Sequence, residues 1–535
     1  MLQPMLRHKV ATGAMLAIIA MACVLYLGSL GERPLQDYDE ALYAIATHEM
    51  VTTGDLATIT FRGQPYFEKP PLYFWLATIS EKIFGENEFA LRLPSALAGI
   101  GLVLLVMLLT RELSGSRWAG VLAGAIELTM APVLVVARDV RLDTLVTFFI
   151  VLAAYAFVRA LKNPKWFLLF GFAAGLAVLA KSVIALFAFV AAAAFAYWLL
   201  EGSVGNRFSF LKQKQFSPSL ENGVVPSGAS NVPDNIEKSS HSNNHSKYEK
   251  WHKAATPFFS AGFWWGIGVF LLVVLPWHIY EIVRFGSAFV QTYVGFNVVE
   301  RTTHDLLSLG ETNFDYVWYL ANFGMPWMQA LVAATLGMAV FWRQIHSQLR
   351  NAAAACLTVV ASVIIVCFAT ATKSSTYLLP LYPFAAVAIA LIAFPVLRAW
   401  TKTVLGSFGA GLAVCLLLVL GLYGAVYNGF HINPYFALTD ELAREEKDVG
   451  EILAEKGMNR TLYAYGDPAL GSIMYYSHNT QSIALLPDDD QPEPGSFIVL
   501  PSGEHQSLSD NFRVASTDAV YLGQHIELLE VLSED

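Results

Sequence analysis

Acidic side chains gather directly after the first long apolar run of the chain. Asp37, Asp39 and Glu40 precede a helical pattern over residues 41–50. A carboxylate there can cap the free N–H groups of the first helical turn, which is a structural role. A carboxylate partly removed from water instead has a raised pKa and can act as a general base. Because ionisable groups are costly beside an apolar span, we favour a catalytic role for Asp39 and Glu40.

The same loop carries a second chemical motif, YFEKPP, which contains Tyr66, Glu68 and Lys69. A lysine beside a glutamate at a turn can be only a surface ion pair. Alternatively, Lys69 binds a phosphate as a point charge, and Glu68 either holds the Lys69 side chain in place or binds a metal. The run 72–84 that follows is amphipathic, which predicts a helix lying in the membrane interface with Phe74 and Trp75 facing lipid.

Further charged and aromatic residues stand at the ends of later apolar runs. They are Arg138 and Asp143 in RDVRLD, Lys181 in AKSVIAL, Arg301 and His304, and Lys373 and Tyr377 in KSSTYLLPLYP. A lone lysine at such a turn commonly extends its ammonium group to the membrane surface without further function. A convergent set of cations, however, suits an anionic phosphate or pyrophosphate whose lipid tail stays in the bilayer.

The elements that position these residues are membrane spans. The 535 residues are 55% hydrophobic and 14% charged, whereas a soluble chain has about 25% charged residues. The apolar residues fall into blocks long enough to cross a bilayer, which predicts about eleven spans. Their approximate limits are 11–30, 90–110, 117–137, 143–161, 166–180, 183–200, 256–276, 326–342, 351–371, 376–397 and 404–427. The net charge of −9 and the absence of a basic domain exclude a nucleic-acid partner.

The distribution of lysine and arginine predicts the orientation of these spans. With the N-terminus in the cytoplasm, nearly every short loop on that side is basic, as the positive-inside rule requires. The basic positions are Arg111, Arg117, Arg159, Lys162, Lys165, Arg343, Arg350, Arg398 and Lys402. The first loop, residues 31–89, and the tail then lie on the extracytoplasmic side. The spans otherwise look apolar through their centres.

Two segments outside the spans differ in composition. The insert 204–253 is rich in Ser, Asn, Lys and Gly and has too few apolar residues to fold, so we expect a disordered cytoplasmic linker. The tail 428–535 alternates helical and strand-like runs separated by Pro, Asp and Gly, which predicts a small extracytoplasmic α/β domain. Residues 1–427 would form the membrane domain.

Taken in order, DYDEALYA, YFEKPPLYFW, RDVRLD, GLAVLAKSVIAL and KSSTYLLPLYP resemble the motifs of one family. The chain is similar to GT-C glycosyltransferases of the aminoarabinose transferase and dolichyl-phosphate-mannose protein mannosyltransferase superfamily. The resemblance covers roughly residues 10–400. It implies an α-helical polytopic GT-C fold in the inner or plasma membrane, a polyprenyl-phosphate-sugar donor, an extracytoplasmic acceptor, and inversion at the anomeric carbon.

The resemblance also implies roles for individual residues. Asp39 matches the first-loop aspartate that deprotonates the acceptor hydroxyl, and Asp143 matches a second acidic position. Glu68 and Lys69 match the EKP pair, with Lys69 near the donor phosphate. The positions that line the donor phosphate pocket in relatives are matched by Lys181, Arg301 and Tyr377, and we add Tyr43, Tyr66, Arg138 and Lys373 as substrate-binding candidates.

One departure from the family pattern bears on the donor. Leu42 stands where many relatives have an arginine, which removes a cation from the expected phosphate site. No cofactor is required by this model, although Asp37, Asp39, Glu68 or His304 could bind a divalent metal. The sugar and the acceptor stay open, the latter between lipid A, another glycolipid, a polysaccharide and a protein. Two other classes also stay open: a transporter of polyprenyl-linked sugars, with charges along a path through the bundle, and a non-catalytic assembly subunit.

Overall fold

The computed structural model describes most of the chain. The described residues are 2–205, 256–304, 312–343, 345–400, 404–431, 434–456, 461–464, 471–478, 483–485, 492, 495–503 and 517–532. The predicted linker 204–253 lies outside them, apart from residues 204 and 205, which end helix α9.

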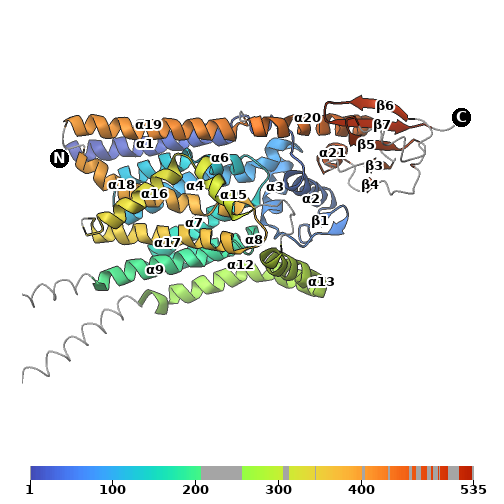
Figure 1. The fold of residues 1–535 in the computed structure, drawn as a ribbon. Helices are drawn as coiled ribbons and strands as arrows, with labels where there is room; N and C mark the ends of the chain where they lie inside the picture. Colours follow the sequence, from blue (N-terminus) through green and yellow to red (C-terminus); the bar gives the residue numbers. More distant parts are fainter. Residues whose placement is uncertain are drawn as a thin grey trace, which may run out of the picture.

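Long apolar helices make up most of the molecule (Figure 1). They are α1 (Leu2–Leu27), α4 (Glu88–Ser114), α5 (Arg117–Leu128), α6 (Ala131–Ala137), α7 (Leu142–Ala160), α8 (Phe167–Ala180), α9 (Leu186–Gly205), α12 (Ala261–Phe285), α15 (Asn313–Asn322), α16 (Trp327–Val340), α17 (Ser347–Ala369), α18 (Leu381–Trp400) and α19 (Val404–Gly429). Short 3-10 helices at Pro164–Trp166, Thr256–Phe259 and Ser375–Leu378 join some of them.

The lengths and composition of these helices define a multi-pass membrane protein. Among the described residues, 6 helices are long and apolar enough to cross a membrane, and 8 if each bent pair is one span. The bent pairs are α5 with α6, at 63°, and α15 with α16, at 95°. Shorter apolar helices cover Pro164–Ala180, Leu186–Leu200 and Val414–Gly429. The number of about eleven spans stays a prediction.

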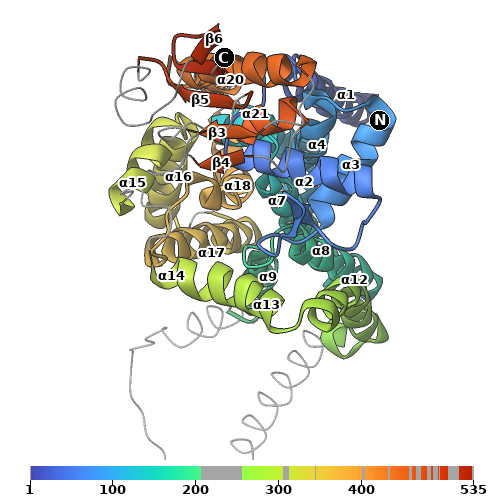
Figure 2. The same ribbon diagram turned by 90° about the vertical axis from the view of Figure 1, so that its right-hand side faces the viewer.

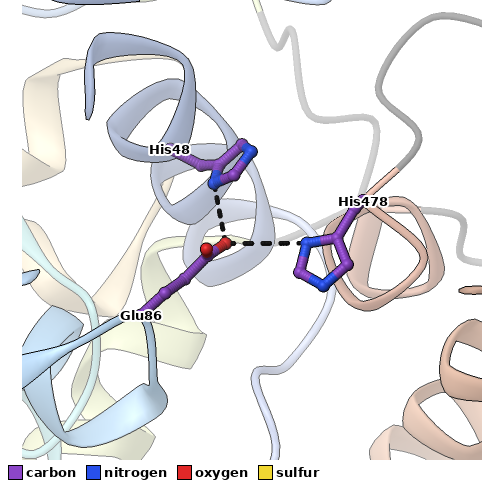
Figure 3. A group of neighbouring side chains, drawn as sticks. All are labelled: His48, Glu86 and His478. Carbon is purple, nitrogen blue, oxygen red and sulfur yellow. Dashed lines mark ion pairs between the residues drawn. The ribbon is translucent and has the colours of Figure 1, made fainter. Parts of the chain in front are cut away.

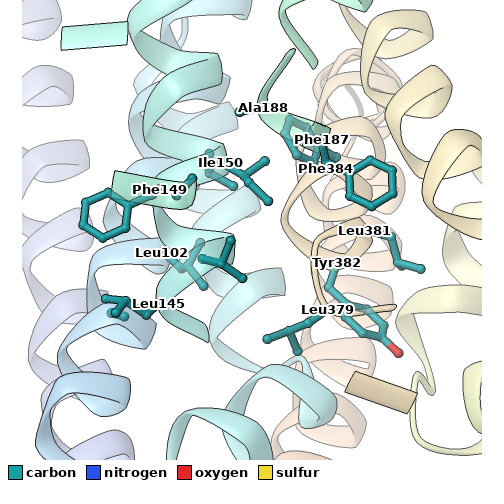
Figure 4. Packing of buried hydrophobic residues seen from close by; sticks show 14 of the residues in the cluster. Leu102, Leu145, Phe149, Ile150, Phe187, Ala188, Leu379, Leu381, Tyr382 and Phe384 are labelled. Atoms are coloured by element: carbon teal, nitrogen blue, oxygen red, sulfur yellow. The ribbon is translucent and has the colours of Figure 1, made fainter. Parts of the chain in front are cut away.

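Apolar side chains from sequence-distant helices pack into one continuous core (Figure 4). In this core, Leu102 and Ile150 of the first half of the chain lie in the same cluster as Phe384 of α18. Helix α8 packs against both α7 and α12. Its backbone approaches α12 so closely that a Cβ atom on Gly171 would lie 1.9 Å from the Gly266 carbonyl oxygen. Small residues permit such close crossings between membrane helices.

The first loop forms its own small elements at one end of the bundle. They are α2 (Asp39–Thr53), β1 (Thr60–Phe61), β2 (Gln64–Pro65) and α3 (Leu72–Phe84). Helices α13 (Ser287–Val290) and α14 (Arg301–Thr303), joined by the π-helix η3 (Gln291–Glu300), reach the same end. Figure 2 looks onto this end and shows α2 between the C-terminal sheet and α13.

The C-terminal residues form two helices and one sheet, which confirms the predicted small α/β unit. Helix α20 (Pro434–Glu455) and helix α21 (Gly471–Tyr476) accompany five strands in the order β4-β3-β5-β7-β6. Strand β3 pairs in parallel with β4 and β5, whereas β7 pairs antiparallel with β5 and β6. The strands are β3 (Leu462–Ala464), β4 (Ile483–Leu485), β5 (Phe497–Pro501), β6 (Thr517–Leu522) and β7 (Ile526–Val531). A domain boundary at residue 428 stays a prediction.

This C-terminal unit is bound to the first loop by specific hydrogen bonds. The backbone N–H of Gly471 donates to Asp37 Oδ1 at 2.7 Å. The hydroxyl of Tyr476 accepts from the N–H of Leu35 at 2.8 Å and donates to Glu88 Oε1 at 2.9 Å. The two regions are far apart in sequence, so the contact is built by the fold rather than by chain proximity.

Two expectations about side chains are wrong. Phe74 does not face lipid: it is fully buried and meets the ring of Tyr43 edge-on, because the apolar face of α3 packs onto α2 and α4. Trp75 is partly exposed and its Nε1–H donates to the Leu56 carbonyl, so its lipid-facing orientation stays a prediction. The spans are also not apolar throughout, since Glu127 of α5 is buried and no described group hydrogen-bonds its carboxylate.

Candidate active site

One cavity of about 270 Å³ opens where the first loop meets the bundle. Its polar lining includes Lys69, Lys181 and Arg301, together with Glu68 and Tyr377. Its apolar lining comes from α9 and α17 and from the residues that precede α9: Val183, Ile184, Leu186, Phe187, Val190, Val366 and Cys367. A cavity that combines cations with an aliphatic wall suits an amphiphilic anion.

Glu68 and Tyr377 hold two of these cations. Glu68 Oε2 lies 3.4 Å from Lys69 Nζ and 3.3 Å from Arg301 Nη2. The other end of the Arg301 guanidinium donates to the Tyr377 hydroxyl at 3.2 Å. Glu68 therefore brings together two positive charges that would otherwise repel each other.

Asp143 holds the third cation. It stands in the first turn of α7 and accepts a hydrogen bond from Lys181 Nζ at 2.6 Å. The same ammonium group lies 5.3 Å from the centre of the Tyr377 ring. Asp143 is buried and does not line the cavity, so its geometry suits positioning of Lys181 rather than proton transfer to a substrate.

Asp39 begins α2 and forms an ion pair with Arg141. The backbone before it is unusual, because Tyr38 has a φ of 66°. Residues other than glycine rarely adopt a positive φ. Tyr43 follows one helical turn later, and its hydroxyl helps to lower the pKa of Asp39. The hydroxyl of Tyr66 lies close enough to Glu68 and Asp39 for both charges to raise its pKa, in addition to the effect of burial. Tyr43 and Tyr66 therefore lie between Asp39 and the charged residues that line the cavity.

The charges of this group shift two pKa values in ways that matter for chemistry. Burial lowers the pKa of Lys69 to about 8, and Arg301 and Lys181 add to that effect. Burial alone would raise the pKa of Asp39, but Arg141, Lys69 and Lys181 outweigh it and lower that pKa. The expected raised pKa of Asp39 is therefore wrong, because the cations around it stabilise the ionised form more than desolvation destabilises it.

Glu40, the second predicted catalytic carboxylate, occupies a closed structural site. Its oxygens accept from Arg92 Nε and Nη2 at 3.0 and 2.9 Å. The N–H groups of Val140 and Gln36 also donate to it, at 2.7 and 3.0 Å. Arg92 lowers the pKa of Glu40 to about 2 despite complete burial. With every lone pair engaged, Glu40 fastens the first loop to α4 and has no free position for a substrate.

Two predicted substrate-binding cations also lie elsewhere. Arg138 donates to the carbonyls of Leu25 and Gly28, at 2.7 Å each, and to that of Gly429 at 2.9 Å, so it closes the end of α1. Lys373 donates to carbonyls at the end of α17, including that of Phe368 at 3.2 Å. Neither side chain lines the cavity. Their charges satisfy helix carbonyls, which is a common role of cations at helix C-termini.

The suggested metal ligands do not assemble. Asp37 accepts from Gly471, Asp39 pairs with Arg141, and Glu68 pairs with Lys69 and Arg301. His304 is exposed and contacts Thr303. Within the part of the chain that the structure describes, a different group of potential metal ligands does assemble, namely His48, Glu86 and His478.

Sequence reasoning missed Arg141 as a site residue, although it stands only three positions after Arg138. Arg141 has an extended backbone and precedes α7, which directs its side chain to Asp39. Nothing in RDVRLD separates Arg141 from Arg138, because residues 138–140 form a turn and a bend rather than an extended segment with alternating side chains.

Comparison with solved structures shows the class of fold. The chain superposes on ArnT from Cupriavidus metallidurans bound to undecaprenyl phosphate with a TM-score of 0.62 and 16% identity, covering 98% of both chains. The archaeal oligosaccharyltransferase AglB from Archaeoglobus fulgidus gives a TM-score of 0.51 at 11% identity, covering 95% of this chain and 71% of that one. The fold is therefore that of the GT-C membrane glycosyltransferases, which confirms the fold class that the resemblance implied.

Sequence comparison finds relatives for one part of the chain. Residues 68–216 match the model of the family described as dolichyl-phosphate-mannose-protein mannosyltransferase. The undecaprenyl phosphate-alpha-4-amino-4-deoxy-L-arabinose arabinosyl transferase of Aeromonas salmonicida is 36% identical over 167 residues, which is 30% of each chain. Its counterpart from Sodalis glossinidius is 32% identical over 177 residues, 31% of this chain and 32% of that one. The aligned segment spans about a third of these relatives, and the similarity to the aminoarabinose transferase group is confirmed.

Proposed function

We propose that this protein is an inverting glycosyltransferase that moves a sugar from a polyprenyl-phosphate donor to an acceptor hydroxyl outside the cytoplasm. The observation that carries the proposal is that Lys69, Lys181 and Arg301 share one cavity with an aliphatic wall. The cations suit a phosphate and the wall suits an isoprenoid chain. Undecaprenyl phosphate is named both for the relatives and for the bound ArnT structure, which makes this lipid the first donor to consider.

The cavity residues would bind the donor through its phosphate. Lys69 and Arg301 share Glu68 as a counterion through long contacts of 3.4 and 3.3 Å, and a phosphate between them could form shorter charge-assisted bonds to both cations. Lys181, which lies between α8 and α9, adds a third positive charge to the cavity. As the bond between the anomeric carbon and the phosphate oxygen breaks, these cations stabilise the negative charge that grows on the leaving phosphate.

Asp39 would receive the proton of the acceptor. The acceptor oxygen attacks the anomeric carbon from the side opposite the phosphate, a new glycosidic bond forms with inversion, and the hydroxyl proton passes to Asp39. The lowered pKa keeps Asp39 ionised before reaction. Its ion pair with Arg141 fixes the carboxylate in place, and its side chain, 43% exposed, stays accessible to an acceptor.

The proposed orientation places this chemistry on the extracytoplasmic side. The N-terminus lies at the end of the bundle opposite the sheet and the first loop (Figure 1). The basic loops favour a cytoplasmic N-terminus, so the cavity mouth and the C-terminal unit would face outward. The C-terminal unit, which hydrogen-bonds the first loop at Asp37, would then border the path of the acceptor.

The experiment that tests the proposal uses the purified full-length protein in nanodiscs. The protein is incubated with a panel of polyprenyl-phosphate sugars and candidate acceptors, beginning with undecaprenyl-phosphate aminoarabinose and lipid A. Mass spectrometry follows released polyprenyl phosphate and glycosylated acceptor. We expect release by the wild type and its loss in Asp39→Asn.

The matched control is Asp55→Asn, an exposed aspartate of the same loop whose Oδ1 only accepts backbone N–H groups. This variant should turn over as the wild type does. Turnover by Asp39→Asn at the wild-type rate would overturn the assignment of the base. Failure of folded wild-type protein to release phosphate from every donor would overturn the transferase itself and favour the transporter or assembly-subunit alternatives.

A further inference from the structure

Two histidines and a glutamate meet outside the cavity, at the contact between the first loop and the C-terminal unit (Figure 3). His48 lies on α2, Glu86 lies between α3 and α4, and His478 lies two residues after the end of α21. Glu86 Oε1 is 2.7 Å from His48 Nδ1 and 3.7 Å from His478 Nδ1. These three ligand atoms all lie within 4.8 Å of one another. None of the three residues lines the cavity.

A second acidic residue, Glu81, lies near this triad and has no hydrogen-bond partner among the described residues. The side chain of Glu81 is only 5% exposed, and neither carboxylate oxygen has a hydrogen-bond partner among the described residues. The charges of Glu86 and His48 both act on Glu81, which shows that it lies near the triad. Burial raises the pKa of Glu81 to about 8, and the charge of Glu86 adds to the rise, so this carboxyl is mostly protonated near neutral pH and does not by itself require a cation.

We propose that His48, Glu86 and His478 bind a divalent transition-metal ion, with Zn²⁺ the ion that the ligands suit best. Two imidazole nitrogens and a carboxylate oxygen are typical zinc ligands, whereas Mg²⁺ and Ca²⁺ prefer oxygen alone. In a tetrahedral zinc site with bonds of about 2.0–2.1 Å, ligand atoms lie roughly 3.3 Å apart. Glu86 Oε1 lies 2.7 and 3.7 Å from the two imidazole nitrogens, and all three ligand atoms lie within 4.8 Å of one another, so ion binding would draw the side chains to that spacing. Water would fill the fourth position.

A metal ion at this site would link the first loop to the C-terminal unit, through His48 and His478, which are more than 400 positions apart in sequence. His48 belongs to the helix that begins with Asp39, and His478 belongs to the C-terminal unit. The side chain of His478 is 60% exposed, so the protein alone holds it loosely. A shared metal ion would fix the C-terminal unit onto α2 without touching the cavity. The proposal does not depend on the proposed transferase activity.

The test measures zinc binding by the full-length protein, purified in nanodiscs with an affinity tag that contains no histidine. The protein is equilibrated with Zn²⁺, separated from free ion by gel filtration, and analysed by mass spectrometry of the metal. Competition with a chromogenic chelator gives the Kd. We expect one zinc ion per chain in the wild type and a Kd weakened more than about 100-fold in His478→Ala. Losing only an outer hydrogen-bond partner of a ligand already costs about 10- to 100-fold.

Controls separate this site from other histidines and from misfolding. His304→Ala, which removes an exposed histidine away from the triad, should bind zinc like the wild type. Co²⁺ loading should give the visible absorption of a tetrahedral site in the wild type and not in His478→Ala. If His478→Ala does not fold, Glu86→Gln, which keeps the side-chain shape, decides in its place. Zinc retained equally by the triad variants, or no stoichiometric zinc in the wild type, would overturn the proposal.

Discussion

Asp39 and Glu40 are consecutive residues in the first turn of α2, yet their carboxylates enter opposite environments. Glu40 is 2% exposed and is enclosed by Arg92 and two backbone N–H groups. Asp39 is half-exposed and meets Arg141 beside the cavity cations. A helix turns about 100° per residue, so neighbours in the chain face different surroundings. The carboxylate that keeps an accessible oxygen can do chemistry, whereas the enclosed one holds the loop in place.

The largest effect on stability should come from the enclosed carboxylate. Glu40→Gln leaves the buried Arg92 charge without a counterion, and we expect the free energy of unfolding to fall by about 3–5 kcal/mol. Chemical denaturation in detergent measures this loss. The fraction of Glu40→Gln protein that folds should keep near-normal turnover per folded molecule. A Glu40→Gln protein as stable as the wild type but inactive would break the comparison, because it would give Glu40 the role assigned to Asp39.

A smaller effect should follow from removing a cavity cation. Lys69→Met keeps the length of the buried side chain but loses its charge-assisted contact to the donor phosphate, which is worth about 1.5–3 kcal/mol. We expect kcat/KM for the donor to fall by the corresponding factor, about 10- to 150-fold, with stability nearly unchanged. The matched control is Lys82→Met, at an exposed lysine of α3 that should have no such effect. Equal donor kinetics in both variants would remove Lys69 from the binding site.

Packing of the bundle gives a third comparison, between the close crossing of α8 with α12 and an open position on α12. Gly171→Leu places a side chain against the Gly266 backbone, and we expect destabilisation of about 1–3 kcal/mol or more, since overpacking forces the helices apart. Gly268→Leu on the same helix as Gly266 meets open space and serves as the control. Thermal unfolding in detergent distinguishes the two. Similar unfolding temperatures would show that α8 and α12 do not cross so closely.

The smallest effect concerns pH. Lys69 binds phosphate best when protonated, and its pKa of about 8 lies below the ordinary lysine value. The value of kcat/KM should therefore be constant below that pH and fall up to tenfold per unit above it. At saturating donor the bound phosphate raises the pKa of Lys69, so kcat should fall only at higher pH. The alkaline limb of kcat/KM should be absent in Lys69→Met, and its persistence there would assign the titration to another group.

The fold was largely predictable because bilayer crossing imposes a length of apolar sequence that composition alone reveals. The YFEKPP motif likewise led to Glu68 and Lys69, and both line the cavity. Which member of a charged cluster faces the cavity was not predictable. Arg138 and Arg141 look equivalent in RDVRLD, and only the end of α1 and the start of α7 decide that one meets carbonyls and the other Asp39.

Electrostatic environment and long-range contacts were also hidden from the sequence. The pKa of Asp39 depends on Lys181, which lies 142 positions away, and the sequence does not give the distances that let cations outweigh desolvation. His48 and His478 looked unremarkable separately, because only the packing of α21 on α2 brings them together. Sites built from such distant partners follow from tertiary structure rather than from local patterns.

The most direct test of the account compares Asp39→Asn and Glu40→Gln side by side in one single-turnover assay and one unfolding experiment. We predict that Asp39→Asn lowers the rate of polyprenyl-phosphate release by roughly 10²- to 10⁴-fold with an unchanged unfolding transition. We predict the reverse for Glu40→Gln, a weakened fold with near-normal release by the folded protein. If both variants lose stability and rate together, or if Asp39→Asn keeps its rate, the division between a reactive and a structural carboxylate is contradicted.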